Sequence, residues 1–197
     1  MDTTRNGSAA PEGGGGKLGG RRIALGVTGS IAAYKACELV RLFVKAGAEV
    51  SVVMTDAARQ FVAPLTFKTL SRRSVATGLF GDPETWVPGH VSLADWCDAL
   101  VVAPCTANSA AKYACGIADD MLSSLVLACR KPLVLAPAMN EGMLDSPATR
   151  ANLAALRARG AVVLDCGEGE LACGAEGRGR MPEPAEVFRA VVEVLSR

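Results

Sequence analysis

The sequence predicts an α/β fold in three layers, a doubly wound parallel sheet of the Rossmann or flavodoxin type. From residue 21 onward, short and continuously apolar runs alternate with longer helical patterns. The apolar runs leave no polar face for water, which is typical of parallel strands covered by helices on both sides. Alternating strands and helices favour an open sheet that binds ligands at the carboxyl ends of its strands.

Each element follows from a local pattern. The expected strands are residues 23–27, 49–54, 99–103, 133–136 and 162–164. The expected helices are residues 31–46, 57–70, 108–114, 119–129, 147–159 and 184–195. Gly47 and Gly160 directly follow two of these helices, where glycine commonly ends a helix. Residues 81–89, with two prolines and a tryptophan, are expected to form a loop.

The composition favours one globular domain at residues 21–197, preceded by a disordered tail at residues 1–20. Half of the 197 residues are hydrophobic, which suits a substantial core, whereas the tail is rich in glycine and poor in large apolar groups. The net charge of +1 gives no reason to expect a nucleic-acid or membrane partner. No apolar run approaches the roughly 20 residues that span a bilayer.

The cysteine and histidine content indicates a reduced, cytoplasmic protein without a metal site. Seven cysteines form no C-x-x-C pair, there is one histidine, and no secretory signal is recognisable. Several cysteines lie in apolar runs, where a reduced cysteine behaves as a small hydrophobic residue.

The first predicted strand runs into Thr28-Gly29-Ser30, and Ile31 opens a helix. This arrangement aims backbone N–H groups and the positive end of a helix at a possible phosphate. A tight turn with a serine N-cap is the alternative, and neither common nucleotide motif is present. Thr55 follows the second strand, and a short polar segment, residues 106–109, follows the third. Polar residues at three strand ends favour a mononucleotide ligand.

Residues 169–180 place Cys173 among glycines and two arginines. Glycines let a backbone fold closely over a ligand, and arginines bind phosphate or carboxylate through paired hydrogen bonds. The segment therefore predicts either a loop that closes over a substrate or a mobile surface loop.

Five segments carry a resemblance to a known family. They are residues 29–35 (GSIAAYK), 90–96 (HVSLADW), 103–108 (APCTAN), 137–143 (PAMNEGM) and 172–180 (ACGAEGRGR). Together they resemble the flavin-dependent cysteine decarboxylases over about residues 21–188, and most closely the phosphopantothenoylcysteine decarboxylases of coenzyme A biosynthesis.

The resemblance implies FMN as the cofactor. It also implies a homotrimer, or a dodecamer of trimers, with active sites between subunits. The residues implied to bind FMN are Gly29, Ser30, Ile31, Thr55, Thr106, Ala107, Asn108, Ser109 and Ala138.

The resemblance further implies the catalytic residues. His90 acts as acid or base at the substrate thiol, Asn140 holds the substrate carboxylate or amide, and Cys173 donates a proton late in the reaction. Asn140, Met143, Arg178 and Arg180 are the implied substrate-binding residues, although the two arginines are equally compatible with solvated positions. The implied reaction converts phosphopantothenoylcysteine into phosphopantetheine.

Three departures from the family pattern leave alternatives open. Leu144 stands where relatives usually carry tryptophan, Cys105 stands where they commonly carry a small residue, and the sequence ends without a synthetase domain. One alternative is a decarboxylase of the C-terminal cysteine of a ribosomal peptide, which yields an enethiol for aminovinyl-cysteine formation. The other is a non-catalytic regulatory flavoprotein, and the joint presence of His90, Asn140 and Cys173 argues against it.

Overall fold

The computed structural model describes residues 16–80, 89–170 and 176–197. Its centre is a six-stranded parallel sheet in the order β3-β2-β1-β4-β5-β6. The strands are β1 Arg22–Val27, β2 Glu49–Met54, β3 Val75–Ala76, β4 Ala99–Cys105, β5 Leu133–Pro137 and β6 Val162–Val163. The chain order reverses between β1 and β4, so this fold has its ligand-binding crevice at the carboxyl ends of those two strands.

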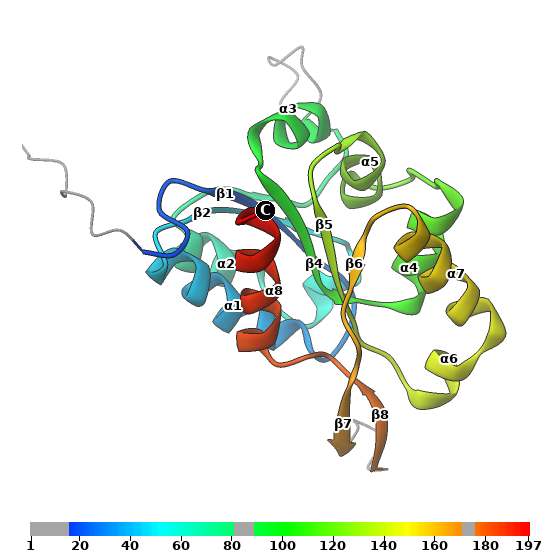
Figure 1. Ribbon diagram of the computed structural model, residues 1–197. Helices are drawn as coiled ribbons and strands as arrows, with labels where there is room; N and C mark the ends of the chain where they lie inside the picture. Colours follow the sequence, from blue (N-terminus) through cyan, green and yellow to red (C-terminus); the bar gives the residue numbers. More distant parts are fainter. Residues whose placement is uncertain (1–15, 81–88, 171–175) are drawn as a thin grey trace, which may run out of the picture.

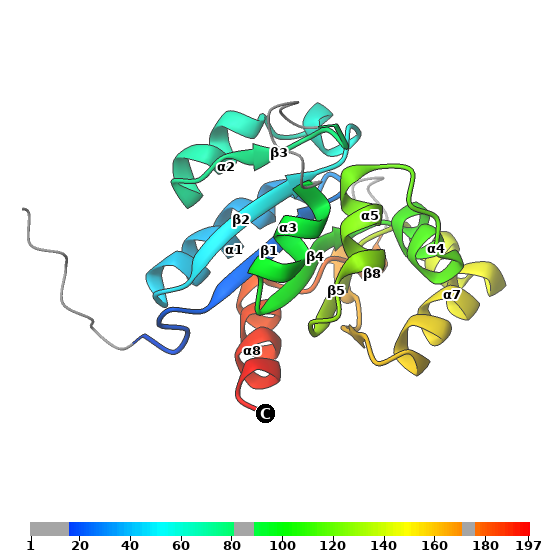
Figure 2. The ribbon, with the colours of Figure 1, turned by 90° about the horizontal axis from the view of Figure 1, so that it is seen from above.

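Helices cover both faces of the sheet, which confirms the predicted three layers (Figures 1 and 2). The helices are α1 Ala33–Lys45, α2 Pro64–Ser71, α3 Gly89–Trp96, α4 Ala107–Cys115, α5 Met121–Ala128, α6 Glu141–Asp145, α7 Pro147–Ala158 and α8 Pro184–Leu195, with a 3-10 turn η1 at Ala58–Gln60. Apolar residues of α1, α2 and α8 form one buried cluster with the sheet. Those of α3, α4, α5 and α7 form a second cluster on the opposite face.

Strand β4 shows why the apolar runs are continuous. All seven of its residues are buried, and successive side chains enter opposite layers. Val101 and Ala103 belong to the first cluster, whereas Leu100 and Val102 belong to the second. A polar residue at any of these positions would therefore be buried on one face or the other.

Residues 16–20 are folded against the domain, which corrects part of the predicted tail. Leu18 is only 2% exposed and packs in the first cluster. Its backbone N–H donates to the carbonyl oxygen of Ala46 over 3.0 Å. A single large apolar residue thus anchors a glycine-rich segment that composition alone assigns to disorder, while residues 1–15 lie outside the described residues.

Two segments differ from the predicted helices and loops. The helix expected at residues 57–70 is split into η1 and α2, because Ala63 is extended and Pro64 opens a new helix. The loop expected at residues 81–89 lies mostly outside the described residues, but its last residue, Gly89, already begins α3. The structure also contains two short elements, β3 and α6, that the sequence analysis did not predict.

The segment at residues 169–180 forms part of a hairpin. Strands β7 Gly167–Glu170 and β8 Glu176–Arg180 pair in antiparallel fashion, apart from the six-stranded sheet. Figure 1 shows this hairpin extending below the carboxyl ends of the large sheet. The loop prediction was wrong for these flanks, and Cys173 lies outside the described residues.

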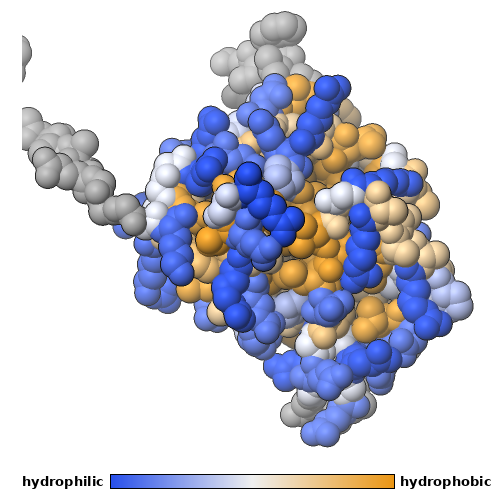
Figure 3. Space-filling model, viewed as in Figure 1, coloured by the Kyte–Doolittle hydropathy of each residue, from blue (hydrophilic) through white to orange (hydrophobic). Residues whose placement is uncertain are grey.

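The face shown in Figure 3 exposes hydrophobic residues at its centre, with hydrophilic residues around them. Val162 and Val163 of the edge strand β6 are half-buried, as is Leu164 directly after it. Within the described ranges, no helix is long and apolar enough to cross a membrane.

Candidate active site

Because the six strands are parallel, the polar residues that follow them lie at one edge of the sheet. The turn after β1 is tight: Ser30 donates its backbone N–H to the carbonyl of Thr28 over 2.9 Å, and its Oγ accepts from the N–H of Ala32 over 3.2 Å. A side chain at Gly29 would overlap the Cβ of Ala57, in the turn after β2. Only glycine therefore allows these two turns to approach so closely.

Thr28 joins the two strands at which the chain order reverses. Its side chain is buried, and its hydroxyl donates to the carbonyl oxygen of Pro104 over 2.8 Å. The same hydroxyl accepts from the backbone N–H of Thr106 over 3.1 Å. The ends of β1 and β4 are thus held in fixed relative positions. Sequence reasoning missed this role, because a threonine after a strand gives no sign of its partner.

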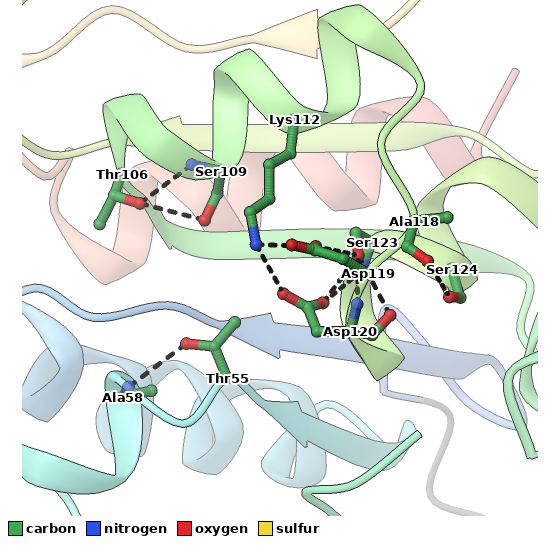
Figure 4. Close-up of polar contacts among 10 residues, drawn as sticks. All are labelled: Thr55, Ala58, Thr106, Ser109, Lys112, Ala118, Asp119, Asp120, Ser123 and Ser124. Atoms are coloured by element: carbon green, nitrogen blue, oxygen red, sulfur yellow. Dashed lines mark hydrogen bonds and ion pairs between the residues drawn. The ribbon is translucent and has the colours of Figure 1, made fainter. Parts of the chain in front are cut away.

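Hydroxyl groups at two further strand ends are engaged in local turns (Figure 4). Thr106 caps α4, where its Oγ1 accepts from the N–H of Ser109 over 3.2 Å and donates to the Ser109 hydroxyl over 3.0 Å. Thr55 Oγ1 accepts from the N–H of Ala58 over 3.3 Å. Residues 106–109 thus form a helix cap, which is compatible with ligand binding because each hydroxyl keeps capacity for another hydrogen bond.

A charged cluster that sequence reasoning missed lies beside these hydroxyls. Lys112 of α4 reaches Asp119 over 2.7 Å and Asp120 over 3.3 Å, as Figure 4 shows. Asp120 also caps α5, since its carboxylate accepts from the N–H of Ser123 over 2.7 Å. The hydrogen bond that Lys112 donates to Asp119 is the main reason that the pKa of Lys112 is raised. The cluster thereby ties α4 to the start of α5.

The end of β5 carries the predicted substrate-binding segment. Ala138 is buried, and its N–H donates to the carbonyl of Cys105 over 3.0 Å. Asn140 is exposed and caps α6, with its Oδ1 accepting from the N–H of Gly142 over 2.8 Å. This bond uses the amide oxygen, so the amide N–H groups are left to donate to a ligand. Met143 is 49% exposed on α6 and so lies on the same surface.

Strand β8 packs onto this segment through backbone and ionic contacts. The N–H of Met139 donates to the carbonyl of Gly179 over 2.9 Å. Arg178 pairs with Glu141 over 3.3 Å and with Asp145 over 3.0 Å. The guanidinium of Arg178 therefore holds the hairpin against α6. The sequence analysis predicted either substrate binding or a solvated position for Arg178 and missed this structural role.

Arg180, also on β8, lies in a second ionic group. Its guanidinium is 3.9 Å from Glu183, whose carboxylate also accepts from the ammonium of Lys35 over 2.7 Å. Lys35 is buried on α1, and Glu183 caps α8. The ion pair between Lys35 and Glu183 therefore links α1 to α8 next to the hairpin.

His90 lies on α3 and is separated from Asn140. In Figure 1, α3 is at the top of the molecule and α6 is at the lower right. The Nδ1 atom of His90 is buried, and it has no hydrogen-bond partner among the residues that the structure describes. A buried ring nitrogen without a partner is costly, which makes it a candidate for contact with a ligand or another subunit.

Cys105 and Cys166, which lie near this edge of the sheet, are poor acids. Burial raises the pKa of Cys105 to about 12, and burial raises that of Cys166 to about 11. Both thiols therefore stay protonated near neutral pH. Cys173, the cysteine singled out from the sequence, lies outside the described residues.

The residues at the crevice fit an anionic cofactor such as FMN. The amino ends of α1 and α4 open on either side of the reversal point, and neither first turn contains an acidic residue. Helix amino ends attract phosphate, and the Gly29 turn provides the close backbone approach that phosphate binding requires. Within the described part of the chain, no group of three or more His, Cys, Asp or Glu residues could hold a metal ion.

Comparisons with known proteins agree with this geometry. A family model described as Flavoprotein matches residues 14–196. The chain is 44% identical over 181 residues to the coenzyme A biosynthesis bifunctional protein CoaBC of Haemophilus influenzae, covering 92% of this chain and 45% of that protein. The chain thus spans less than half the length of this relative.

Solved structures are similar over nearly the whole chain. A PPC decarboxylase mutant complexed with pantothenoylaminoethenethiol has a TM-score of 0.81 and 30% identity, with 90% of this chain and 100% of that chain covered. The FMN-dependent cysteine decarboxylase SpaF has a TM-score of 0.77 and 30% identity, with 91% and 97% covered.

Proposed function

Because the chain belongs to the flavoprotein family, among the flavin-dependent cysteine decarboxylases, we propose that it binds FMN and decarboxylates a cysteine with a free carboxylate. The proposed substrate is phosphopantothenoylcysteine and the product is phosphopantetheine, which places the reaction in coenzyme A biosynthesis. The similarity to CoaBC supports this substrate class. We further propose that the protein acts in the cytoplasm.

The Asn140 segment is the observation that carries the proposal. The amide oxygen of Asn140 accepts the hydrogen bond that caps α6. The amide N–H groups of this exposed side chain are therefore left to bind a ligand at the carboxyl edge of the sheet. Such a group binds a carboxylate by donating hydrogen bonds to it. Bound FMN would accept a hydride from the carbon that carries the thiol, and the thiocarbonyl group formed in this way can take up the electrons that carbon dioxide leaves behind. Asn140 then orients the departing carboxylate.

His90 is the proposed acid and base at the substrate thiol. It is the single histidine of the chain, and histidine is the side chain that most often serves as acid or base in enzymes. Its buried Nδ1 has no partner in the described part of one chain, which fits a nitrogen that contacts substrate. Cys173 is proposed to supply a proton, and bound FMN would return the hydride, which together reduce the enethiol to a saturated thiol.

The separation of His90 and Asn140 supports a site shared between subunits. Helix α3, which carries His90, lies at the top of Figure 1, whereas α6, which Asn140 caps, lies at its lower right, and this separation supports a site built from two copies. We therefore propose a homotrimer, or a dodecamer of trimers, in which His90 of one subunit meets the Asn140 segment of another. Sedimentation velocity tests the assembly, and complementation tests the shared site. Mixing inactive His90→Asn and Asn140→Asp proteins after dissociation should restore part of the activity.

The substitution Asn140→Asp tests the role of Asn140 itself. Aspartate caps a helix as well as asparagine does, so α6 should remain intact. Its carboxylate would repel the substrate carboxylate, and decarboxylation should be lost while FMN stays bound. Turnover at the wild-type rate would refute the assignment.

The nature of the substrate is tested by product analysis. Purified protein should be yellow and should release FMN on denaturation. Mass spectrometry of products from phosphopantothenoylcysteine and from a cysteine-terminated peptide, assayed side by side, separates the two decarboxylase functions. Protein that binds FMN but converts neither compound would favour a regulatory flavoprotein.

A further inference from the structure

Two cysteines face one another away from the carboxyl edge of the sheet. The Sγ atoms of Cys97 and Cys129 are 3.8 Å apart. Cys97 directly follows α3, and Cys129 directly follows α5. Each backbone N–H donates to a carbonyl in the last turn of its own helix, that of Leu93 over 3.1 Å and that of Leu125 over 2.9 Å. The backbone therefore fixes both cysteines at neighbouring helix ends.

The two thiols differ in their access to solvent. Cys97 is fully buried in the second apolar cluster. Cys129 is half-buried and lines a pocket of about 490 Å³, together with Arg130, Lys131 and Arg159. Cys129 is therefore the more accessible of the two thiols.

The hydrogen bond between the two thiols favours ionisation of Cys129. It lowers the pKa of Cys129, and the backbone and charge of Lys131 add to this effect, whereas burial and Asp95 oppose it. The same hydrogen bond and burial raise the pKa of Cys97, and Asp98 adds to this effect. A thiolate is the reactive form of cysteine toward oxidants. We therefore expect Cys129 to react first, which agrees with its greater exposure.

We propose that Cys97 and Cys129 form a reversible disulfide when the protein meets a peroxide. Hydrogen peroxide first oxidises the Cys129 thiol to a sulfenic acid and is itself reduced to water. The Cys97 sulfur then attacks the sulfenic sulfur, the S–O bond breaks, and a second water leaves. Two thiols and one peroxide thus give one disulfide and two waters. Since a disulfide bond is about 2.05 Å long, the sulfurs must approach by roughly 1.8 Å, which side-chain rotation can provide.

The disulfide would join the end of the helix that carries His90 to the end of α5. These two helices already pack against each other, and Gly89 at the start of α3 lies close to Met121 at the start of α5. The covalent link would therefore restrict how far α3 can move relative to α5. This device is independent of the proposed decarboxylation.

Peptide mapping tests the proposal on the full-length protein. The protein is exposed to hydrogen peroxide at neutral pH, alkylated, digested and analysed by mass spectrometry. We expect a linked Cys97–Cys129 peptide that disappears on reduction. Cys129→Ser should abolish it, whereas Cys115→Ser, which removes an exposed cysteine, should leave it unchanged. Absence of the linked peptide from the oxidised wild-type protein would overturn the proposal.

Alkylation kinetics provide a test that needs no variant. Treatment with hydrogen peroxide should strongly slow the modification of Cys129 by iodoacetamide, because the Cys129 sulfur is then bonded to Cys97. An unchanged rate of modification of Cys129 after peroxide treatment would contradict the proposal.

Discussion

The hydroxyl of Thr28 offers a sharp test of how the ligand-binding edge is held together. Thr28→Val keeps the shape of the side chain but removes the bonds to the Pro104 carbonyl and the Thr106 N–H. Thr28→Ser keeps the hydroxyl and removes one buried methyl group. The two variants therefore separate hydrogen bonding from packing at one position.

The expected magnitudes follow from the burial of the groups involved. A buried polar group left without a partner costs about 1–3 kcal/mol. Thr28 is 1% exposed and Pro104 is buried, whereas Thr106 is half-buried and can be partly hydrated. We therefore expect Thr28→Val to lose about 2–4 kcal/mol of unfolding free energy. Loss of one methyl group in Thr28→Ser should cost only about 1 kcal/mol.

Urea unfolding of the flavin-free protein measures both effects. With a typical slope of about 2 kcal/mol per molar urea, the midpoint should fall by roughly 1–2 M for Thr28→Val and by about 0.5 M for Thr28→Ser. FMN affinity should also fall in Thr28→Val, because the segments that follow β1 and β4 would no longer be tied together by the Thr28 hydroxyl. Equal midpoints for the two variants would refute the reasoning.

Three further predictions address the hairpin, α5 and a buried thiol. Gly179→Ala places a Cβ against the carbonyl oxygen of Met139, at a residue whose φ of +128° favours glycine. Turnover should fall about tenfold, and unchanged turnover would show that activity does not need the hairpin to pack against the segment after β5. Asp120→Ala removes the α5 cap and should cost about 1 kcal/mol in urea unfolding, whereas Asp120→Asn should cost less. Burial raises the pKa of Cys105 to about 12, so its stabilising contribution is full below about pH 9 and is lost toward pH 12. Unfolding free energy should fall more steeply over that range in the wild type than in Cys105→Ala; parallel curves would exclude this contribution.

The sheet and the long helices could be predicted because burial on both faces leaves a direct mark on the sequence. Strand β2 and helix α8 have the predicted bounds, since apolar runs and proline at a helix start are local signals. The hairpin at β7 and β8 could not be predicted. Its residues are mostly glycines and charged groups, and its pairing depends on contacts with the segment after β5.

The candidate site was predictable in its residue types but not in its connections. Gly29, Thr55 and Thr106 follow predicted strands, and the parallel sheet brings their turns to one edge. The link from Thr28 to Thr106 joins residues 78 positions apart, and no local pattern reports such a bond. The roles assigned to His90, Asn140 and Cys173 stay predictions that mutation must test.

The ion pairs of Arg178 make ionic strength an experimental variable for this protein. Arg178 and both of its carboxylate partners are exposed, so dissolved ions weaken their attraction; the screening length falls from about 10 Å at 0.1 M salt to about 3 Å at 1 M. Concentrated salt should therefore favour detachment of β8 from α6, with little effect on the apolar layers. Michaelis constants measured in buffers of different conductivity would then report this detachment together with substrate affinity.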